Sequence, residues 1–156
     1  MAEPAIFVIL FGVVLIYLPI RLFGVLNWPT TIGGLQVTGI VVGGIGAAVA
    51  LAAAAAFAFI GRGTPAPFAA PRRLVTCGLY RFVRNPMYIG VGLFFAGAAI
   101  FFQSVLGFAY VALFVVSSHL FIVFYEEPTL QHAFGAEYAQ YCERVGRWWP
   151  RVRQDG

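Results

Sequence analysis

Charged residues are scarce in this chain of 156 residues. They make up 10% of the sequence, whereas hydrophobic residues make up 61% and the mean hydropathy is +0.86. An ordinary soluble domain carries about a quarter charged residues, so the composition excludes most soluble folds and predicts an integral membrane protein. No charge lies between Arg21 and Arg62 or between Arg84 and Glu126. Each gap exceeds the roughly 20 apolar residues that cross a bilayer.

Lysine is absent, and all ten basic residues are arginine. A sequence pI near 9.4 raises the question of nucleic-acid binding, but no exposed basic helix accompanies it, and we expect no nucleic-acid partner. Nine of the ten arginines flank the third and fourth apolar stretches on one side. Because basic residues gather on the cytoplasmic side, we expect both termini and the polar segments to be cytoplasmic, in an inner or plasma membrane.

Cysteine and histidine occur only twice each. Cys77 and Cys142 lie in segments that we expect to be cytoplasmic, where thiols stay reduced, so no disulfide is predicted. The histidines and cysteines have no metal-ligand spacing, and neither a Ser/His/Asp order nor a P-loop is present. The sequence therefore predicts no metal site and no classical hydrolase.

The apolar stretches predict a single all-α membrane domain over residues 1–156, with about four transmembrane helices. These spans are placed at about 5–26, 32–60, 86–103 and 106–125, with a cytoplasmic loop at 61–85 and a cytoplasmic tail at 126–156. The first stretch lacks the basic start and the cleavage site of a signal peptide. In the tail, Leu130, Phe134, Tyr138 and Tyr141 recur at helical spacing, which predicts an amphipathic helix.

Three features of the sequence are candidates for a functional site. Gly43, Gly44 and Gly46 give the second span a slim face, which suits either close helix packing or the approach of a ligand to the backbone. The polar residues before the third span suit either anchoring on the positive side or binding of an anion by free N–H groups behind a proline. They are Arg81, Arg84, Asn85, Pro86 and Tyr88.

The third feature is a pair of carboxylates, Glu126 and Glu127, where the fourth span leaves the membrane. The pair is either a solvated helix end or a group that binds a cation or accepts a proton, since burial would raise its pKa into a useful range. His119 lies about two helical turns earlier and is either a packing residue or a second candidate base.

Three blocks of sequence resemble the phospholipid methyltransferase and isoprenylcysteine carboxyl methyltransferase superfamily of integral membrane methyltransferases. They are Arg84-Asn85-Pro86-Met87-Tyr88-Ile89-Gly90, Tyr125-Glu126-Glu127-Pro128 and Phe134-Gly135-Ala136-Glu137-Tyr138-Ala139-Gln140-Tyr141, in the family order and spacing. Asn85 stands where most members have histidine, and phosphatidylethanolamine N-methyltransferases are similar to this chain at that position.

The resemblance implies that S-adenosylmethionine binds at the cytoplasmic mouth, while a lipid acceptor enters sideways from the bilayer. The cofactor-binding residues that it implies are Gly44, Gly46, Arg84, Asn85, Pro86, Tyr88, Glu126, Glu127 and Tyr138. Arg147 and Trp148 are substrate-binding candidates in a trailing block that closes the pocket. Because an amine acceptor must lose a proton, Glu127 and His119 are the candidate catalytic residues.

The sequence leaves the methyl acceptor and the oligomeric state open. It predicts a methyltransferase for a lipid or another membrane-soluble acceptor, with a phospholipid amine as one candidate. An isoprenylcysteine-type carboxyl or thiol methyltransferase is the first alternative, although Ser117 to Tyr125 lacks the arginines that engage a carboxylate in those enzymes. A non-enzymic transport or assembly protein and a larger, nicotinamide-dependent sterol reductase are the others.

Overall fold

The computed structural model describes residues 17–23, 29–61 and 73–151 of the chain. Within these ranges the regular structure is helical, apart from an isolated parallel bridge between Val83 and Gly146. The elements are α2 (Leu18–Leu22), α3 (Gly34–Phe59), the 3₁₀-helix η2 (Gly78–Arg81), α4 (Pro86–Phe102), α5 (Val105–Phe121), the π-helix η3 (Ile122–Glu126) and α6 (Glu127–Arg144). The predicted all-α class is confirmed for the described residues.

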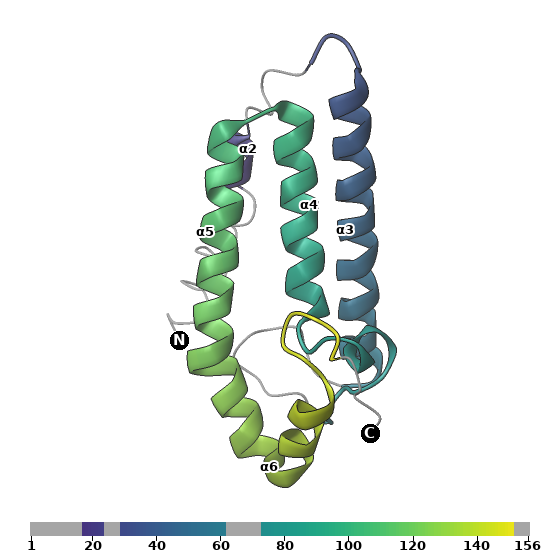
Figure 1. The fold of residues 1–156 in the computed structure, drawn as a ribbon, viewed down its shortest axis with the longest axis vertical. Coiled ribbons are helices and arrows are strands. Elements are labelled where there is room, and N and C mark those ends of the chain that lie inside the picture. Colours follow the sequence, from purple (N-terminus) through teal and green to yellow (C-terminus); the bar gives the residue numbers. More distant parts are fainter. Residues whose placement is uncertain (1–16, 24–28, 62–72, 152–156) are drawn as a thin grey trace, which may run out of the picture.

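Three apolar helices, α3, α4 and α5, run along the long axis of the molecule (Figure 1). Two described stretches are long and apolar enough to cross a membrane, namely Gly34–Phe59, with a hydropathy of 2.3, and Val105–Arg144, with 2.1. α4 is apolar but shorter, at 17 residues. Four membrane crossings stay a prediction, because most of the span placed at 5–26 lies outside the described residues.

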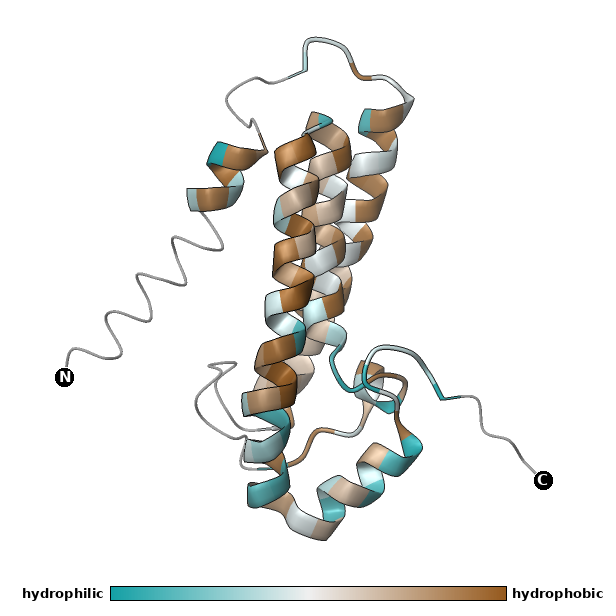
Figure 2. Cartoon of the chain, turned by 60° about the vertical axis from the view of Figure 1, so that its left-hand side comes forward, coloured by the Kyte–Doolittle hydropathy of each residue, from teal (hydrophilic) through white to brown (hydrophobic). Residues whose placement is uncertain are grey.

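The polar residues gather at one end of this apolar bundle. Figure 2 shows hydrophobic colours along the helices and hydrophilic colours around α6 and the segment that follows it. Large apolar side chains on the bundle surface are exposed, among them Leu51 at 70% and Leu113 at 64%. Exposed apolar surface of this extent marks contact with lipid or with a partner, and it agrees with the membrane protein that the composition predicts.

Glycines allow α3 and α4 to approach each other closely. Gly39, Gly43 and Gly46 lie one turn apart on one face of α3, and a Cβ on Gly39 would come within 2.7 Å of the Gly97 carbonyl oxygen of α4. A Cβ on Gly46 would likewise overlap the backbone of Phe94. The glycine cluster is therefore a helix-packing seam, one of the two interpretations that the sequence leaves open.

A tight turn joins α4 to α5. Gln103 ends α4 in the left-handed region, with φ of 50°, and Ser104 begins α5 by accepting a hydrogen bond from the Gly107 N–H at 3.0 Å. The Ser104 hydroxyl also donates to the Leu22 carbonyl at 2.7 Å, which ties α2 to this end of the bundle. The two helices that follow each other along the chain are thereby antiparallel neighbours.

The helix that starts with α5 continues through η3 into α6. In η3 the Glu127 N–H donates to the Ile122 carbonyl, five residues earlier, and Pro128 has no N–H with which to continue a regular ladder. Inside α6, Gly135 has φ of 52°, a conformation that favours glycine, and it bends the helix. These irregular turns direct α6 back toward the start of α4 (Figure 1).

Candidate functional site

Polar residues from three separate parts of the chain meet at the hydrophilic end of the bundle. Arg84 and Asn85 precede α4, Glu127 begins α6, and Arg147 lies in residues 145–151, here called the C-terminal strap. Figure 1 shows the strap, in yellow, returning toward the lower ends of α3 and α4. The strap brings a distant part of the sequence to the two motif blocks at the beginnings of α4 and α6.

Glu127 is held by two arginines. Its Oε1 and Oε2 each accept a hydrogen bond of 2.7 Å, from Nε and Nη2 of Arg147 respectively. Arg84 Nη1 lies 3.1 Å from Glu127 Oε1 and completes the cluster. A fork of two parallel, charge-assisted bonds fixes the geometry of both partners, so Glu127 links α6 to the strap and to the start of α4.

Backbone contacts reinforce the link between the strap and α4. The Arg84 N–H donates to the Gly146 carbonyl at 2.9 Å, beside the bridge from Val83 to Gly146. Asn85 is 7% exposed, and its side-chain amide donates to the Arg147 carbonyl at 3.3 Å. Pro86 follows at the first position of α4, where its missing N–H costs nothing. In this chain Asn85 therefore positions the strap.

Tyr88 and Glu126 form a second polar contact. The Tyr88 hydroxyl donates to Glu126 Oε2 at 3.0 Å and joins α4 to the end of η3. Glu126 thus differs from Glu127, since among the described residues both ion pairs of 4 Å or less end on Glu127. The two adjacent carboxylates face different surroundings.

His119 and Trp148 form a third contact, between α5 and the strap. The Trp148 indole N–H donates to His119 Nδ1 at 3.1 Å, and the ring centroids lie 6.1 Å apart. A neutral imidazole that accepts at Nδ1 carries its proton on Nε2 and has no free nitrogen lone pair for another proton. The predicted catalytic role of His119 stays a prediction, and this geometry supports a role in holding Trp148.

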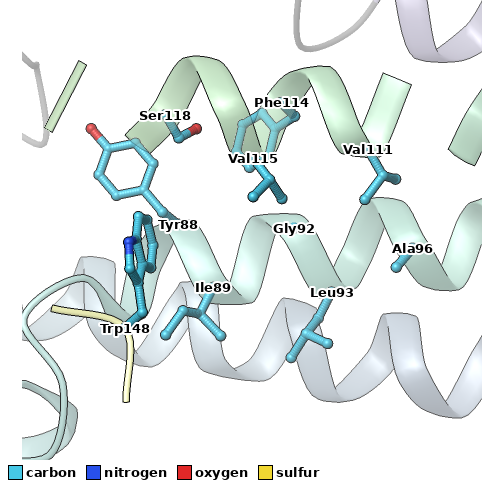
Figure 3. Close-up of a pocket in the computed structure, with 10 residues that line it drawn as sticks. All are labelled: Tyr88, Ile89, Gly92, Leu93, Ala96, Val111, Phe114, Val115, Ser118 and Trp148. Atoms are coloured by element: carbon cyan, nitrogen blue, oxygen red, sulfur yellow. The ribbon is translucent and has the colours of Figure 1, made fainter. Parts of the chain in front are cut away.

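An apolar slot of about 300 Å³ lies between α4 and α5. Tyr88 and Trp148 stand at one end of the slot, and Ala96 and Val111 lie toward the other (Figure 3). Its remaining wall residues are Ile89, Gly92, Leu93, Phe114, Val115 and Ser118. Because Tyr88 also bonds Glu126, the polar end of the slot opens at the cluster of ionic residues.

The remaining predicted site residues lie apart from this cluster or beneath it. Gly44 is exposed on α3, and a Cβ added there would have nothing within 4 Å, whereas Gly46 is buried in the seam with α4. Tyr138 is 4% exposed and packs with Tyr141 and Val145 under the strap. The cofactor roles of these three residues stay predictions.

The charges around Glu127 change its acidity. Burial by itself raises the pKa of the Glu127 carboxyl, but the hydrogen bonds from Arg147 and the charges of Arg84 and Arg147 outweigh burial and hold this pKa below its usual value. The hydrogen bonds to Glu127 in turn raise the pKa of Arg147, against the effect of burial. Glu127 is therefore a firmly ionised carboxylate and a weak base.

Some residues of the site carry no signal in the sequence. Arg84 Nη1 donates to Cys142 Sγ at 2.8 Å, and the Tyr141 hydroxyl donates to the Tyr80 carbonyl at 2.6 Å. Burial, with the charge of Glu126 adding to it, raises the pKa of Tyr80 to about 12. Each contact joins residues about 60 positions apart, so only the fold shows that they meet.

The donor set fits S-adenosylmethionine, the cofactor that the sequence motifs imply. Arg84 Nε is buried and has no hydrogen-bond partner among the described residues, which leaves a cationic donor for a carboxylate. Glu126 has Tyr88 as its hydrogen-bond donor and retains lone pairs for the amino group or the ribose hydroxyls. A cation and a free carboxylate beside an apolar slot match the charges of an amino-acid sulfonium.

An apolar helical bundle with an ionic cluster at one end and a slot open to that cluster defines a membrane-embedded enzyme for an apolar substrate. The family model described as phospholipid methyltransferase matches residues 35–137, about two thirds of the 156 residues. The chain belongs to this family, and membership implies a methyltransferase that acts on lipid-type substrates. A search of curated proteins and a search of solved structures each found no match. Most of α6 lies outside the last motif-free stretch of the match, which ends at residue 137, and the strap lies beyond it.

Proposed function

We propose that this chain is an S-adenosylmethionine-dependent methyltransferase that methylates an amine-bearing lipid at the cytoplasmic face of the membrane. The observation that carries the proposal is the position of the ionic cluster at the open end of the apolar slot, joined to it through Tyr88. A lipid acceptor needs an apolar site for its chain and a polar site for its reacting group. The slot and the cluster supply these side by side.

S-adenosylmethionine supplies a methyl group on a positively charged sulfur, and transfer needs the acceptor, the methyl carbon and the sulfur to be in line. Arg84 would hold the cofactor carboxylate through its unsatisfied Nε. Glu126 would accept hydrogen bonds from the amino group or the ribose. Glu127, Asn85 and Arg147 hold Arg84 and the strap in place, so their part is to fix the shape of the site.

The slot is the proposed site of the acceptor's apolar chain. Its volume of about 300 Å³ lies at the lower end of the range of ligand pockets, about 300–1,000 Å³. Its walls are apolar side chains of α4 and α5, and Trp148 of the strap covers the polar end (Figure 3). A chain that enters from the lipid between these helices places its head group beside Tyr88 and Trp148.

The chemistry of the mouth favours an amine over a carboxylate as the acceptor. No arginine occurs between Ser117 and Tyr125, on the helix that lines the slot. Arg84 and Arg147 are both engaged with Glu127. A carboxylate acceptor would lack a free cation, whereas an ammonium group finds the Glu126 carboxylate and two aromatic rings close to the slot.

Cofactor binding tests the first part of the proposal. Titration calorimetry of the purified full chain in detergent should show S-adenosylmethionine binding, and Arg84→Gln should weaken it about tenfold or more. Arg144→Gln is the matched control, because Arg144 is exposed on α6 and its side chain bonds only the nearby Gln140 carbonyl among the described residues. Equal affinity of the two variants would remove Arg84 from the cofactor site.

Product chemistry tests the second part. The chain is incubated with methyl-labelled cofactor in nanodiscs that contain phosphatidylethanolamine, and the lipid fraction is treated with mild base. An N-methyl group resists base, whereas the methyl ester of an isoprenylcysteine-type product is hydrolysed and releases methanol. Base-stable label in the amine lipid supports the proposal. Base-labile label supports the carboxyl alternative, and no label in any lipid leaves a transport or assembly role.

A further inference from the structure

The two neighbouring carboxylates of the site have unequal numbers of partners. Both oxygens of Glu127 are bonded by Arg147, and Arg84 adds a second cation. Glu126 accepts from the neutral Tyr88 hydroxyl, and neither described ion pair involves it. A carboxylate whose charge is not neutralised by arginine can receive a proton, whereas one that two arginines hold cannot do so readily. The unequal surroundings therefore divide the roles of the pair.

Tyr88 lies between Glu126 and the slot. Its side chain lines the end of the slot where Trp148 also stands, and its hydroxyl donates to Glu126 Oε2 at 3.0 Å (Figure 3). Glu126 itself is not among the residues that line the slot. A polar group of the acceptor at this end of the slot would reach the Tyr88 oxygen before it reached the carboxylate.

We propose that Tyr88 and Glu126 form a proton relay that removes the proton from the acceptor's ammonium group. The inference rests on the proposed function and names the residues that prepare its nucleophile. It also reassigns the base, because His119 Nδ1 is occupied by the Trp148 indole and Glu127 is occupied by arginines.

The relay balances without a further reactant. The ammonium N–H bond breaks and its electron pair stays on nitrogen, while the proton passes to the Tyr88 oxygen as the Tyr88 proton passes to Glu126. Glu126 becomes a neutral carboxylic acid, and Tyr88 ends as it began. The nitrogen pair then forms the bond to the methyl carbon as the carbon–sulfur bond breaks, with its pair going to sulfur. Glu126 later releases its proton to water at the cytoplasmic mouth.

Three titratable side chains face Glu126. Tyr88 contacts it from α4, Tyr80 of η2 lies close enough to feel its charge, and Glu127 is its neighbour along the chain. Two of these are neutral phenols at physiological pH and the third is an anion. An anionic neighbour favours uptake of a proton by Glu126, which suits an acceptor of protons.

The test compares initial rates of methyl transfer to phosphatidylethanolamine in nanodiscs over about pH 6.5 to 10 for the wild type, Glu126→Gln and Tyr88→Phe. Without the relay, only amine already neutral in solution can react, and primary amines titrate near pH 10. Both variants should be about 100-fold slower at pH 7. Their rates should rise about tenfold per pH unit and approach the wild-type rate at the alkaline end.

The controls separate the relay from other roles. Glu137→Gln makes the same change of charge on an exposed residue of α6 and should follow the wild type at every pH. Thermal unfolding reports whether a variant is folded, and Tyr88→Phe keeps the ring that lines the slot. Cofactor affinity, measured by calorimetry, should change less than about threefold in Tyr88→Phe.

Specific outcomes would overturn the relay. A wild type that methylates the lipid alongside variants with its rate and pH profile would exclude it and leave the proposed function intact. Slow variants without recovery at high pH, together with a matching loss of cofactor affinity, would make Tyr88 and Glu126 cofactor ligands instead. A wild type that binds no S-adenosylmethionine would overturn both proposals, and the calorimetry shows this before any rate is measured.

Discussion

The guanidinium of Arg147 and the carboxylate of Glu127 form two parallel hydrogen bonds, each 2.7 Å long. The two residues are 20 positions apart, and between them lie the rest of α6 and the turn into the C-terminal strap. Because the Arg147 carbonyl also accepts from Asn85, this one residue connects the strap with α6 and with the start of α4. The shape of the site depends on this fork.

Replacing Arg147 by lysine should loosen the strap. Lysine keeps the charge but cannot form two parallel bonds, so we expect Arg147→Lys to lower the free energy of unfolding by about 1–3 kcal/mol. Thermal and denaturant unfolding in detergent measure the effect. Arg144→Lys is the matched control, since Arg144 is exposed and forms no ion pair with the acidic residues of the described chain. Equal losses in both variants would show that the fork adds no stability.

Stability should depend on the ionisation of Glu127. Its pKa in the folded protein lies below the ordinary value of 4.5, so the unfolded state binds the proton more readily. The contribution of this carboxylate is complete above pH 4.5 and is lost as the pH falls through the lower folded value. Unfolding temperatures of the wild type and Glu127→Gln, measured from about pH 7 to about pH 3, should differ most at neutral pH and converge in acid. A constant difference would contradict this.

The glycine seam and the predicted cofactor element give different expectations for neighbouring glycines. Gly46 faces the backbone of α4 and Gly44 faces open space. We expect Gly46→Ala to cost about 1–3 kcal/mol of stability, because overpacking forces the helices apart. Gly44→Ala should leave stability unchanged or raise it by up to about 1 kcal/mol. Calorimetry on the Gly44 variant separately tests its predicted cofactor role, which a clear loss of affinity would support.

The sequence allowed some of this arrangement to be predicted and not the rest. The apolar runs of α3, α4 and α5 follow from composition, and the break at Gln103 and Ser104 follows from local turn chemistry. The motif blocks that include Arg84 and Glu126 are local strings, so they identify candidate residues without any fold. Their partners depend on the bends at η3 and Gly135, which decide where α6 directs the strap. Small backbone rotations at a few residues set such directions, and side-chain periodicity does not encode them.

The division of roles between Glu126 and Glu127 shows the same limit. Both belong to one motif, and in the sequence they are equivalent carboxylates at a helix end. The π-turn of η3 separates them, since one is directed to Tyr88 and the other to the arginines. By contrast, the choice between Gly44 and Gly46 was available from the sequence. Gly39, Gly43 and Gly46 recur at helical spacing, which selects the glycines of a single face.

Trp148 and Trp149 provide the last prediction, because two adjacent indoles of the strap have opposite surroundings. Trp148 lines the slot and donates to His119, whereas Trp149 is 82% exposed. We expect Trp148→Ala to raise the KM for the lipid acceptor roughly tenfold and to leave the affinity for S-adenosylmethionine nearly unchanged. His119→Ala removes one hydrogen bond, worth about 1 kcal/mol, and should raise the KM about fivefold.

Trp149→Ala is the matched control and should retain the wild-type KM, because its ring touches no part of the slot lining. Initial rates against the mole fraction of phosphatidylethanolamine in nanodiscs separate KM from kcat. A fall in kcat alone in the Trp148 variant would assign Trp148 to the chemical step. Equal effects of the two tryptophan substitutions would show that the strap acts through general contact with the membrane, since only Trp148 can act through the slot.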